Sequence, residues 1–336
     1  MMNSINSFRR LLLVVTESCN FDCDYCYVLK SKKDMSYGTA KKALDDFMHG
    51  SVKDKEVIFI GGEPLMKYDI IKKLILYSKS RDYEVKFGFP TNGSLLTQEI
   101  LEFFSEEKVH VSLSVDGPEE INDSHRINDK KRDLSSILGL CKHYKNVGIR
   151  MTVSPDFSNK MFNNFKFFFN LGFDKVNLQP VQKVFWGKEK IISYLNELNK
   201  IIVFAKNNKV KMSILDDCFS EDNAVKRCPM GNFEVCVGPD GAIYACQIYL
   251  SFKEDNRDWL KIGDLDKGID KMKLDKFSYY KICEKENIHC KKCNPSELCT
   301  KICLLYGFNG EKDLKIYRSN RVFQGKVQEL VKLHMS

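Results

Sequence analysis

The cysteines constrain this chain more than any other feature of its sequence. The 336 residues include thirteen cysteines, and most of them fall into two groups. The first group, close to the N-terminus, consists of Cys19, Cys23 and Cys26. The second group crowds the last third of the chain and contains Cys228, Cys236, Cys246, Cys283, Cys290, Cys293, Cys299 and Cys303. Such grouping indicates metal or redox sites wherever the thiols stay reduced.

Nothing in the sequence predicts export or a membrane span. The longest early apolar run, Leu11–Val15, has five residues, whereas a signal peptide needs about 7–15 apolar residues and a membrane helix about 20. We therefore predict a cytoplasmic protein without membrane association, and the cytosol keeps thiols reduced. The net charge of +8 is spread along the chain. Since no dense basic run is present, no nucleic-acid partner is expected.

The first 182 residues repeat one pattern, a short β-branched or aromatic run, a turn and a helix-like stretch. Helical spacing of apolar residues marks Thr39–His49, Tyr68–Lys79 and Gln98–Glu106. The predicted strands are Leu11–Val15, Val57–Ile60, Val85–Phe89, Val109–Val115, Val147–Val153 and Lys175–Leu178. This alternation predicts right-handed βαβ units that build a parallel sheet.

The predicted fold class is α/β, a partial (β/α)6 barrel of the TIM type followed by a small Cys-rich domain. Polar and glycine residues follow each predicted strand, as in barrels whose active site lies at the strand C-termini. A flat doubly wound sheet gives the same order of elements, so it remains the alternative. The predicted domains are the barrel at 1–182, a helical bridge at 183–227, the Cys-rich domain at 228–310 and a C-terminal helix at 311–336. We expect a hairpin of Phe233–Val237 and Ala242–Tyr244 in the Cys-rich domain.

The spacing Cys19-x3-Cys23-x2-Cys26 places three thiolates in one loop after the first predicted strand. Three thiolates can bind three irons of a [4Fe–4S] cube and leave the fourth iron open to another ligand. Structural zinc normally takes four protein ligands, so a loop with three cysteines favours the iron–sulfur cluster. A zinc-binding interaction module is the alternative in which the chain is not an enzyme.

With Tyr25 before Cys26, and Gly61-Gly62-Glu63-Pro64 after the second predicted strand, this motif resembles the radical S-adenosylmethionine (SAM) enzymes. The resemblance covers essentially the whole chain. It implies that the reduced cluster cleaves SAM to methionine and a 5′-deoxyadenosyl radical, which abstracts a hydrogen atom from the substrate. It also implies that SAM contacts Tyr25, Gly61, Gly62, Glu63, Pro64, Asn92, Ser114 and Arg126. For Asn92, Ser114 and Arg126 the alternative is an ordinary capping or solvated role at a strand–helix turn.

The C-terminal pattern Cys290-x2-Cys293-x5-Cys299-x3-Cys303 resembles the SPASM extension of that family. This resemblance implies two auxiliary [4Fe–4S] clusters, bound by the eight cysteines of the second group. The sequence departs from the family pattern because no cysteine follows Cys303. Either Cys283 completes the second auxiliary cluster, which we favour, or one of its irons is open. We expect Cys141 and Cys218 to be buried thiols, with hydrogen donation as the catalytic alternative.

The resemblance implies an oxidoreductase that modifies a ribosomally made peptide, with a thioether or other crosslink favoured over epimerisation. The alternative is a small-molecule dehydrogenase that oxidises an alcohol. Gln247 follows Cys246 where anaerobic sulfatase-maturating enzymes have an Asp base. Because an amide does not accept a proton at neutral pH, we expect a different reaction. The first predicted strand begins close to Met1, so we expect any leader-binding protein to be separate. The expected electron donor is a flavodoxin or ferredoxin.

Overall fold

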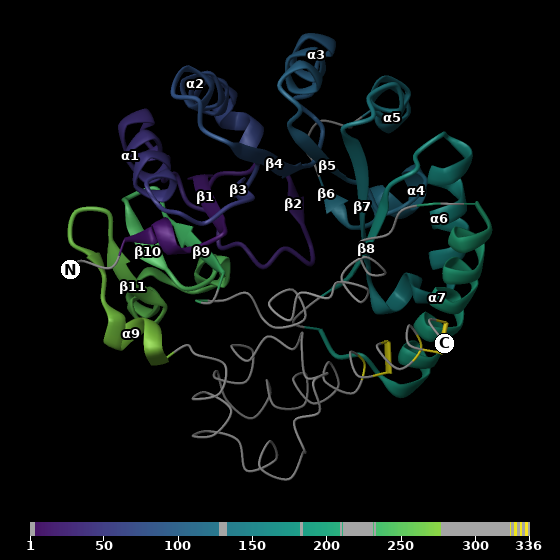
Figure 1. The fold of residues 1–336 in the computed structure, drawn as a ribbon. Coiled ribbons are helices and arrows are strands. Elements are labelled where there is room, and N and C mark those ends of the chain that lie inside the picture. Colours follow the sequence, from purple (N-terminus) through teal and green to yellow (C-terminus); the bar gives the residue numbers. More distant parts are fainter. Residues whose placement is uncertain are drawn as a thin grey trace. The chain divides into compact units, whose positions relative to one another are not determined.

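The computed structural model describes residues 4–127, 133–181, 184–208, 210, 231, 233–276, 323, 326, 327, 330, 333 and 334. The chain divides into two compact units, which we describe separately. Unit 1 is built from residues within 1–22, 26–112 and 229–291, and unit 2 from residues within 23–25, 113–228 and 292–336. Figure 1 shows the helices and strands of both units.

Unit 1 is a mainly parallel sheet with helices packed along it (Figure 1). Its strands lie in the order β12-β11-β10-β9-β1-β3-β4-β5. They are β1 (Arg10–Thr16), β3 (Lys55–Gly61), β4 (Val85–Thr91), β5 (His110–Ser114, shared with unit 2), β9 (Glu234–Val237), β10 (Ala242–Tyr244), β11 (Lys261–Asp264) and β12 (Gly268–Ile269). The helices are η1 (Ile5–Ser7), α1 (Tyr37–Met48), η2 (Pro64–Lys67), α2 (Tyr68–Ser80), α3 (Gln98–Glu106), η4 (Gln247–Ser251), η5 (Glu254–Trp259) and α9 (Lys271–Lys276).

Strand β1 lies in the middle of this sheet, which explains its apolar sequence. It pairs in parallel with β3 on one side and with β9 on the other. All five residues of Leu11–Val15 are buried, because both faces of a parallel sheet are covered and its strands become continuous hydrophobic runs. The C-terminal end of β1 therefore has a fixed position, and the cysteine loop begins directly after it.

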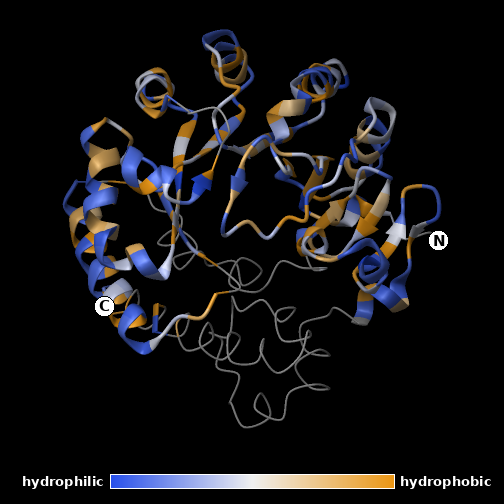
Figure 2. Cartoon of the chain, turned by 180° about the vertical axis from the view of Figure 1, so that it is seen from behind, coloured by the Kyte–Doolittle hydropathy of each residue, from blue (hydrophilic) through white to orange (hydrophobic). Residues whose placement is uncertain are grey.

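The helices of unit 1 follow from capping and amphipathic spacing. The Ser36 hydroxyl accepts a hydrogen bond from the Thr39 N–H and begins α1. The buried residues of this helix, Ala40, Ala43, Leu44 and Phe47, lie three or four positions apart and so share one face. Figure 2 shows apolar and polar residues alternating around the helices in this way.

Unit 2 contains a second set of strands and helices. The end of β5 lies beside β7 (Val147–Val153), where the Val115 N–H bonds to the Arg150 carbonyl, and β7 pairs in parallel with β8 (Val176–Pro180). The short strands β2 (Asp22–Cys23, Asp22 belonging to unit 1) and β6 (Arg126–Ile127) form a separate pair. The helices are α4 (Glu119–Asp123), α5 (Leu134–Cys141), η3 (Pro155–Lys160), α6 (Met161–Asn170) and α7 (Lys188–Asn208). Phe323 packs on Trp186 and Tyr194, and the described positions between 323 and 333 are helical.

Six predicted strands and three predicted helices are present within a few residues of their expected bounds. Strand β7 and helix α3 match their predicted ranges from end to end. The elements that the sequence did not mark include β2, β6, β11, β12, α6 and several shorter helices. β2 and β6 have two residues each, too few for a periodic pattern.

The hairpin of β9 and β10 forms as predicted, and β9 joins the sheet of unit 1. The sequence assigned the hairpin to a domain at 228–310, separate from the barrel at 1–182. In the structure β9 pairs with β1, with Leu11 opposite Val235, and all four residues of β9 are buried. The hairpin thus extends the sheet of unit 1, where the apolar residues of β9 are buried.

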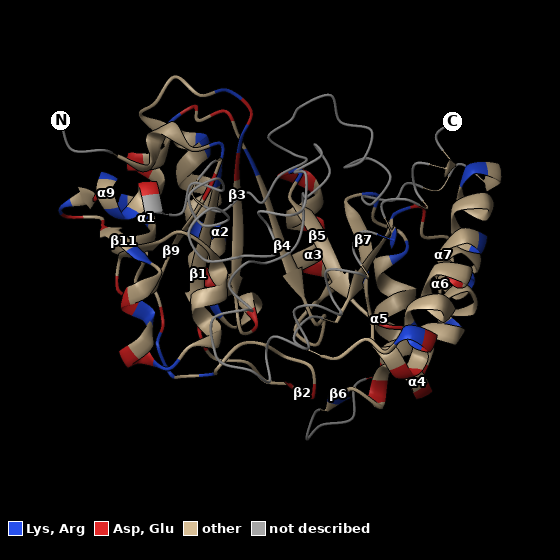
Figure 3. Cartoon of the chain, turned by 90° about the horizontal axis from the view of Figure 1, so that it is seen from below, with Lys and Arg blue, Asp and Glu red and all other residues tan. Residues whose placement is uncertain are grey.

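Charges of both signs are interspersed along the described helices, as Figure 3 shows. No helix in the described part of the chain is long and apolar enough to cross a membrane.

Candidate active site

The loop after β1 carries the first cysteine of the motif. Cys19 is half-buried, and its Sγ accepts a hydrogen bond from the Phe21 N–H at 3.4 Å. Phe21 is buried and anchors the loop. Burial raises the pKa of the Cys19 thiol. A backbone donor on a cysteine sulfur stabilises the thiolate form, which is the form that binds iron.

The glycines at the end of β3 bring that strand against the cysteine loop. The Gly62 N–H donates to the Thr16 carbonyl at 3.0 Å, and the Glu63 N–H donates to the Ser18 carbonyl at 2.9 Å. A Cβ atom on Gly61 would lie 1.9 Å from the Thr16 oxygen, and one on Gly62 would lie 2.1 Å from the Ser18 oxygen. Gly61 also has φ of +149°, which side chains rarely adopt. Only glycine permits this close approach.

We predict that Gly62→Ala lowers the stability of unit 1 by about 1–3 kcal/mol, the usual cost of overpacking. The added methyl group would overlap the Ser18 carbonyl and approach the Cys19 Cβ to 2.9 Å. We therefore expect less iron per chain after reconstitution. Thermal unfolding and iron analysis measure the two effects.

The matched control is Gly139→Ala in helix α5, where a Cβ atom has no neighbour within 4 Å. Alanine in a helix interior is favoured over glycine by up to about 1 kcal/mol. If Gly62→Ala had the same stability and iron content as the control, the predicted clash between the added methyl group and the Ser18 carbonyl would be wrong.

The carboxylate of Glu63 fixes the ends of β3 and β4 together. Its side chain is 2% exposed, and it accepts hydrogen bonds from the Thr91 hydroxyl at 2.7 Å and from the Asn92 and Leu65 N–H groups at 2.7 and 3.1 Å. The Asn92 amide in turn donates to Asn20, which lies in the cysteine loop, at 2.9 Å. Glu63 and Asn92, two of the residues predicted to bind SAM, therefore lie together beside this loop.

In unit 2, Asp116 joins two other predicted SAM ligands. The Tyr25 hydroxyl donates to Asp116 at 2.5 Å, and Arg126 donates to both oxygens of the same carboxylate, each at 2.9 Å. The Thr152 N–H adds a further hydrogen bond at 2.8 Å. The Arg126 guanidinium also lies 5.5 Å from the centroid of the Tyr25 ring. The family resemblance placed Asp116 in the stretch Ser114-Val115-Asp116-Gly117, which resembles a cofactor contact, but it did not indicate that Asp116 binds Tyr25 and Arg126.

Burial and charge act on this cluster in opposite directions. Asp116 and Arg126 are 3% and 7% exposed. Burial alone lowers the pKa of Arg126, but the Asp116 carboxylate more than offsets this, so the pKa is raised and the guanidinium stays charged. Burial raises the pKa of the Tyr25 phenol, which therefore stays protonated and donates to Asp116. The cluster is a fixed ion pair with a neutral phenol.

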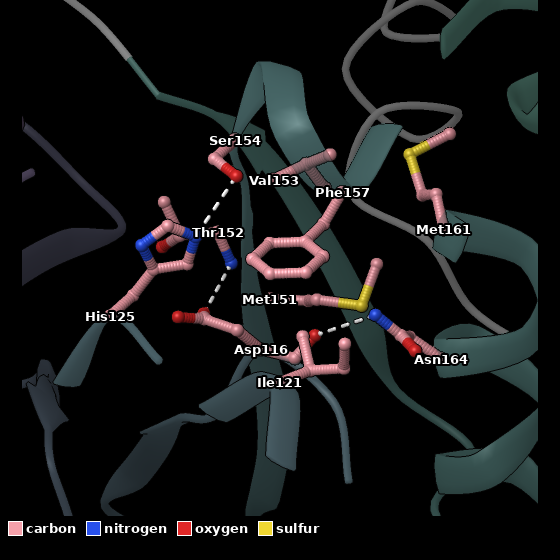
Figure 4. Close-up of a pocket in the computed structure, with 10 residues that line it drawn as sticks. All are labelled: Asp116, Ile121, His125, Met151, Thr152, Val153, Ser154, Phe157, Met161 and Asn164. Atoms are coloured by element: carbon pink, nitrogen blue, oxygen red, sulfur yellow. Dashed lines mark hydrogen bonds between the residues drawn. The ribbon is translucent and has the colours of Figure 1, made fainter. Parts of the chain in front are cut away.

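A pocket of unit 2 opens beside Asp116 (Figure 4). His125 lies at its edge with both ring nitrogens engaged, Nδ1 with the Asp24 carboxylate at 2.6 Å and Nε2 with the Ser154 hydroxyl at 3.0 Å. Phe157 packs edge-on against the imidazole at 5.0 Å. The sequence analysis assigned no role to this carboxylate–imidazole–hydroxyl chain, because His125 has no partner at metal-ligand spacing in the sequence.

The other predicted site residues have varied surroundings. Ser114 is half-buried at the end of β5, and Cys26 is exposed. Cys141 is fully buried in α5, as expected for a packing thiol. Cys236 is fully buried on β9, where burial raises its pKa, whereas Cys246 is half-buried directly before η4. The remaining predicted cysteines lie outside the described residues, namely Cys218, Cys228, Cys283, Cys290, Cys293, Cys299 and Cys303.

Residues 13–166 match the family model of the radical SAM superfamily. This part of the chain is a radical SAM domain. The match begins within β1 and ends within α6, so it includes the three-cysteine motif and the Glu63 and Asp116 clusters. The chain thus contains the domain of an enzyme family, as the motif indicated, and the cofactors of this family are SAM and a [4Fe–4S] cluster.

Relatives extend the similarity along most of the chain. The chain is 24% identical to a cysteine-type anaerobic sulfatase-maturating enzyme of Clostridium novyi, over 89% of this chain and 88% of that protein. It is 24% identical to the radical SAM cyclopropyl synthase TigE of Paramaledivibacter caminithermalis, over 88% and 68%. An uncharacterized protein of Methanocaldococcus jannaschii, MJ0907, is 34% identical over 40% of this chain, which spans about half (49%) of that relative.

A solved structure confirms the predicted fold class. The sulfatase-maturating enzyme anSMEcpe, with bound AdoMet and the Cp18Cys peptide, superimposes with a TM-score of 0.72. The match covers 95% of this chain and 98% of that one at 20% identity. The α/β fold with a parallel sheet is therefore shared, and the partial barrel is preferred over the flat doubly wound alternative.

The described residues fit the two cofactors. Cys19, Cys23 and Cys26 are thiols of one short loop, and each is at least partly exposed. Thiolates are the ligands of [4Fe–4S] clusters, and three of them would leave one iron open to a further ligand. The close approach at Gly62 leaves the end of β3 beside Cys19 without an intervening side chain. The SAM-binding roles of the individual residues remain predictions.

Proposed function

We propose that this radical SAM enzyme modifies a ribosomally made peptide, with a thioether or other crosslink as the favoured product. The observation that carries the proposal is similarity along nearly the whole chain to sulfatase-maturating enzymes, whose substrates are proteins. A related structure holds a peptide together with AdoMet. Similarity over 88% of the chain to a cyclopropyl synthase supports bond formation as an outcome.

The residues of the chain bind and orient, while the cofactor supplies the difficult step. When bound, SAM and the reduced cluster supply the 5′-deoxyadenosyl radical that abstracts a hydrogen atom from the substrate. The three thiolates hold the cluster, and Glu63 and Asn92 position the end of β3 beside it. Asp116 keeps Tyr25 and Arg126 at fixed places.

We propose that two auxiliary clusters are bound through the second cysteine group. Gln247, the first residue of η4, directly follows the half-buried Cys246. An amide does not accept a proton at neutral pH, so we propose a reaction other than sulfatase maturation. The proposed partners are the peptide, a separate leader-binding protein, and a flavodoxin or ferredoxin as electron donor.

The test begins with a search for a small Cys-rich open reading frame beside the gene, whose encoded peptide then serves as the substrate. The peptide is incubated anaerobically with reconstituted enzyme, SAM and dithionite and then analysed by mass spectrometry. A thioether is expected to remove two hydrogen atoms from the peptide and to leave one cysteine unreactive to iodoacetamide. The variant with Cys19, Cys23 and Cys26 replaced by Ala is the control for background oxidation.

The other outcomes distinguish the alternatives. Epimerisation leaves the peptide mass unchanged in H2O and introduces solvent deuterium in D2O. SAM turnover that depends on a sugar alcohol or aminocyclitol, and not on peptide, would contradict the peptide proposal and favour the small-molecule dehydrogenase.

A further inference from the structure

A buried ion pair connects the C-terminal part of unit 1 to the beginning of the cysteine loop. Arg257 of η5 donates to both oxygens of Glu17, at 2.6 and 3.2 Å. Glu17 is fully buried and Arg257 is 7% exposed. Glu17 lies two residues before Cys19, whereas Arg257 lies outside the matched residues 13–166. The radical SAM domain, residues 13–166, therefore forms a buried ion pair with Arg257, a residue outside that domain.

Glu17 also closes the loop on itself. Its carboxylate accepts a hydrogen bond from the Ser31 hydroxyl at 2.7 Å, and its N–H donates to the Lys33 carbonyl at 2.8 Å. The Ser31 N–H donates to the Glu17 carbonyl at 3.3 Å. Cys19 and Cys26 lie between these two ends. Glu17 thus connects the two ends of the segment that carries Cys19 and Cys26.

Arg257 is itself held in place by its own segment. Its Nε donates to the Phe252 carbonyl at 3.1 Å, and its guanidinium lies 5.2 Å from the centroid of the Tyr249 ring. Tyr249 stacks on Tyr244 of β10 with ring centroids 3.7 Å apart. The planar guanidinium of Arg257 is held by these contacts, so it can hold the Glu17 carboxylate in one orientation.

A second contact runs from the same segment to the same loop. The Leu29 N–H, three residues after Cys26, donates to the Leu250 carbonyl of η4 at 2.7 Å. The segment from Cys246 to Trp259 therefore holds the loop before Cys19 through Glu17 and after Cys26 through Leu29. Directional hydrogen bonds define the loop position more narrowly than apolar contacts do.

We propose that Arg257 is a positioning residue of the radical SAM cluster, which acts through Glu17 to hold Cys19 and Cys26 in the geometry that binds iron. The proposal rests on the cluster at the three-cysteine motif and not on the peptide substrate. Because Cys246 begins the segment that contains Arg257, the same contacts connect a predicted auxiliary ligand to the loop of the first cluster.

The experiment compares Arg257→Met and Arg257→Lys with Arg10→Met. Arg10 is the matched control because its ion pairs with Glu56, at 2.8 Å, and Glu234, at 3.5 Å, lie at the opposite end of β1. A seven-residue strand spans roughly 20 Å, so the control removes arginine ion pairs, more exposed than that of Arg257, far from the cysteines. The variants are first checked for folding by thermal unfolding.

Two readouts follow the loop itself. In cluster-free protein, iodoacetamide labelling of the half-buried Cys19 is followed by mass spectrometry, and we expect Arg257→Met to accelerate it about tenfold, because opening of the loop exposes this thiol. In reconstituted protein, we expect an altered EPR spectrum of the reduced cluster and slower SAM cleavage. Arg257→Lys keeps the charge and is expected to restore part of both.

Labelling rates and EPR spectra that are unchanged in folded Arg257→Met would overturn the proposal. Equal acceleration in Arg10→Met would also overturn it, because the effect would then reflect general stability. Failure of the peptide assay leaves both readouts intact, so this proposal and the proposed function fail separately. Absence of iron in the wild-type protein would contradict the cluster on which the proposal rests.

Discussion

Replacement of Cys19, Cys23 and Cys26 together by Ala is expected to remove about four irons per chain, the content of one [4Fe–4S] cluster, and to abolish SAM cleavage. The three thiolates are the predicted ligands of the cluster in the radical SAM domain, so we expect no cluster to form without them. Iron and acid-labile sulfide are measured on anaerobically reconstituted protein. 5′-Deoxyadenosine is measured after reduction with dithionite.

The iron count also decides how many auxiliary clusters form. About twelve irons that fall to about eight would establish two auxiliary clusters, at four irons each. About eight that fall to about four would establish one. The control is Cys141→Ala, which removes a buried thiol of α5 and is expected to leave the iron content unchanged. Zinc with negligible iron in the wild-type protein would contradict the radical mechanism.

Asp116→Ala is expected to lower the free energy of unfolding by about 3–5 kcal/mol, the usual cost of leaving one partner of a buried ion pair alone. Arg126 would stay charged in a buried position, and the Tyr25 hydroxyl would lose its acceptor. At a few degrees per kcal/mol, the midpoint of thermal unfolding falls by roughly 10 °C. Asp116→Asn keeps the shape and part of the hydrogen bonding, so its effect should be smaller.

The matched control is Asp266→Ala, which removes an exposed ion pair with Lys42. Exposed pairs contribute little to stability, so we expect no measurable shift. A midpoint for Asp116→Ala equal to that of this control would mean that Arg126 is not held by Asp116 in solution. Loss of SAM cleavage in a folded Asp116→Asn protein would support the positioning of Tyr25 and Arg126.

Much of the fold could be predicted because parallel strands have a strong local signal. The run Val147–Val153 was predicted from its β-branched and apolar residues, and strand β7 has the same bounds. The second strand of the predicted hairpin, Ala242–Tyr244, likewise has the observed bounds. Such segments are buried along their length, so each residue contributes to the same pattern.

The partners of the buried polar groups could not be predicted in this way. Asp116 and Tyr25 lie 91 positions apart, and Glu17 and Arg257 lie 240 positions apart. A charged residue in a sequence is usually solvated, and nothing local marks one that meets an opposite charge in the folded chain. The same reason explains the hairpin, whose strands were recognised while their pairing with β1 was not.

The sequence by itself determined the ligand chemistry and the order of the elements. The spacing of Cys19, Cys23 and Cys26 indicated an iron–sulfur cluster because thiolate number and spacing are local properties. Tertiary structure decided which groups hold that loop in place. Glu63, Asp116 and Arg257 act through partners brought near only by strand pairing and helix packing, so their roles depend on the folded chain.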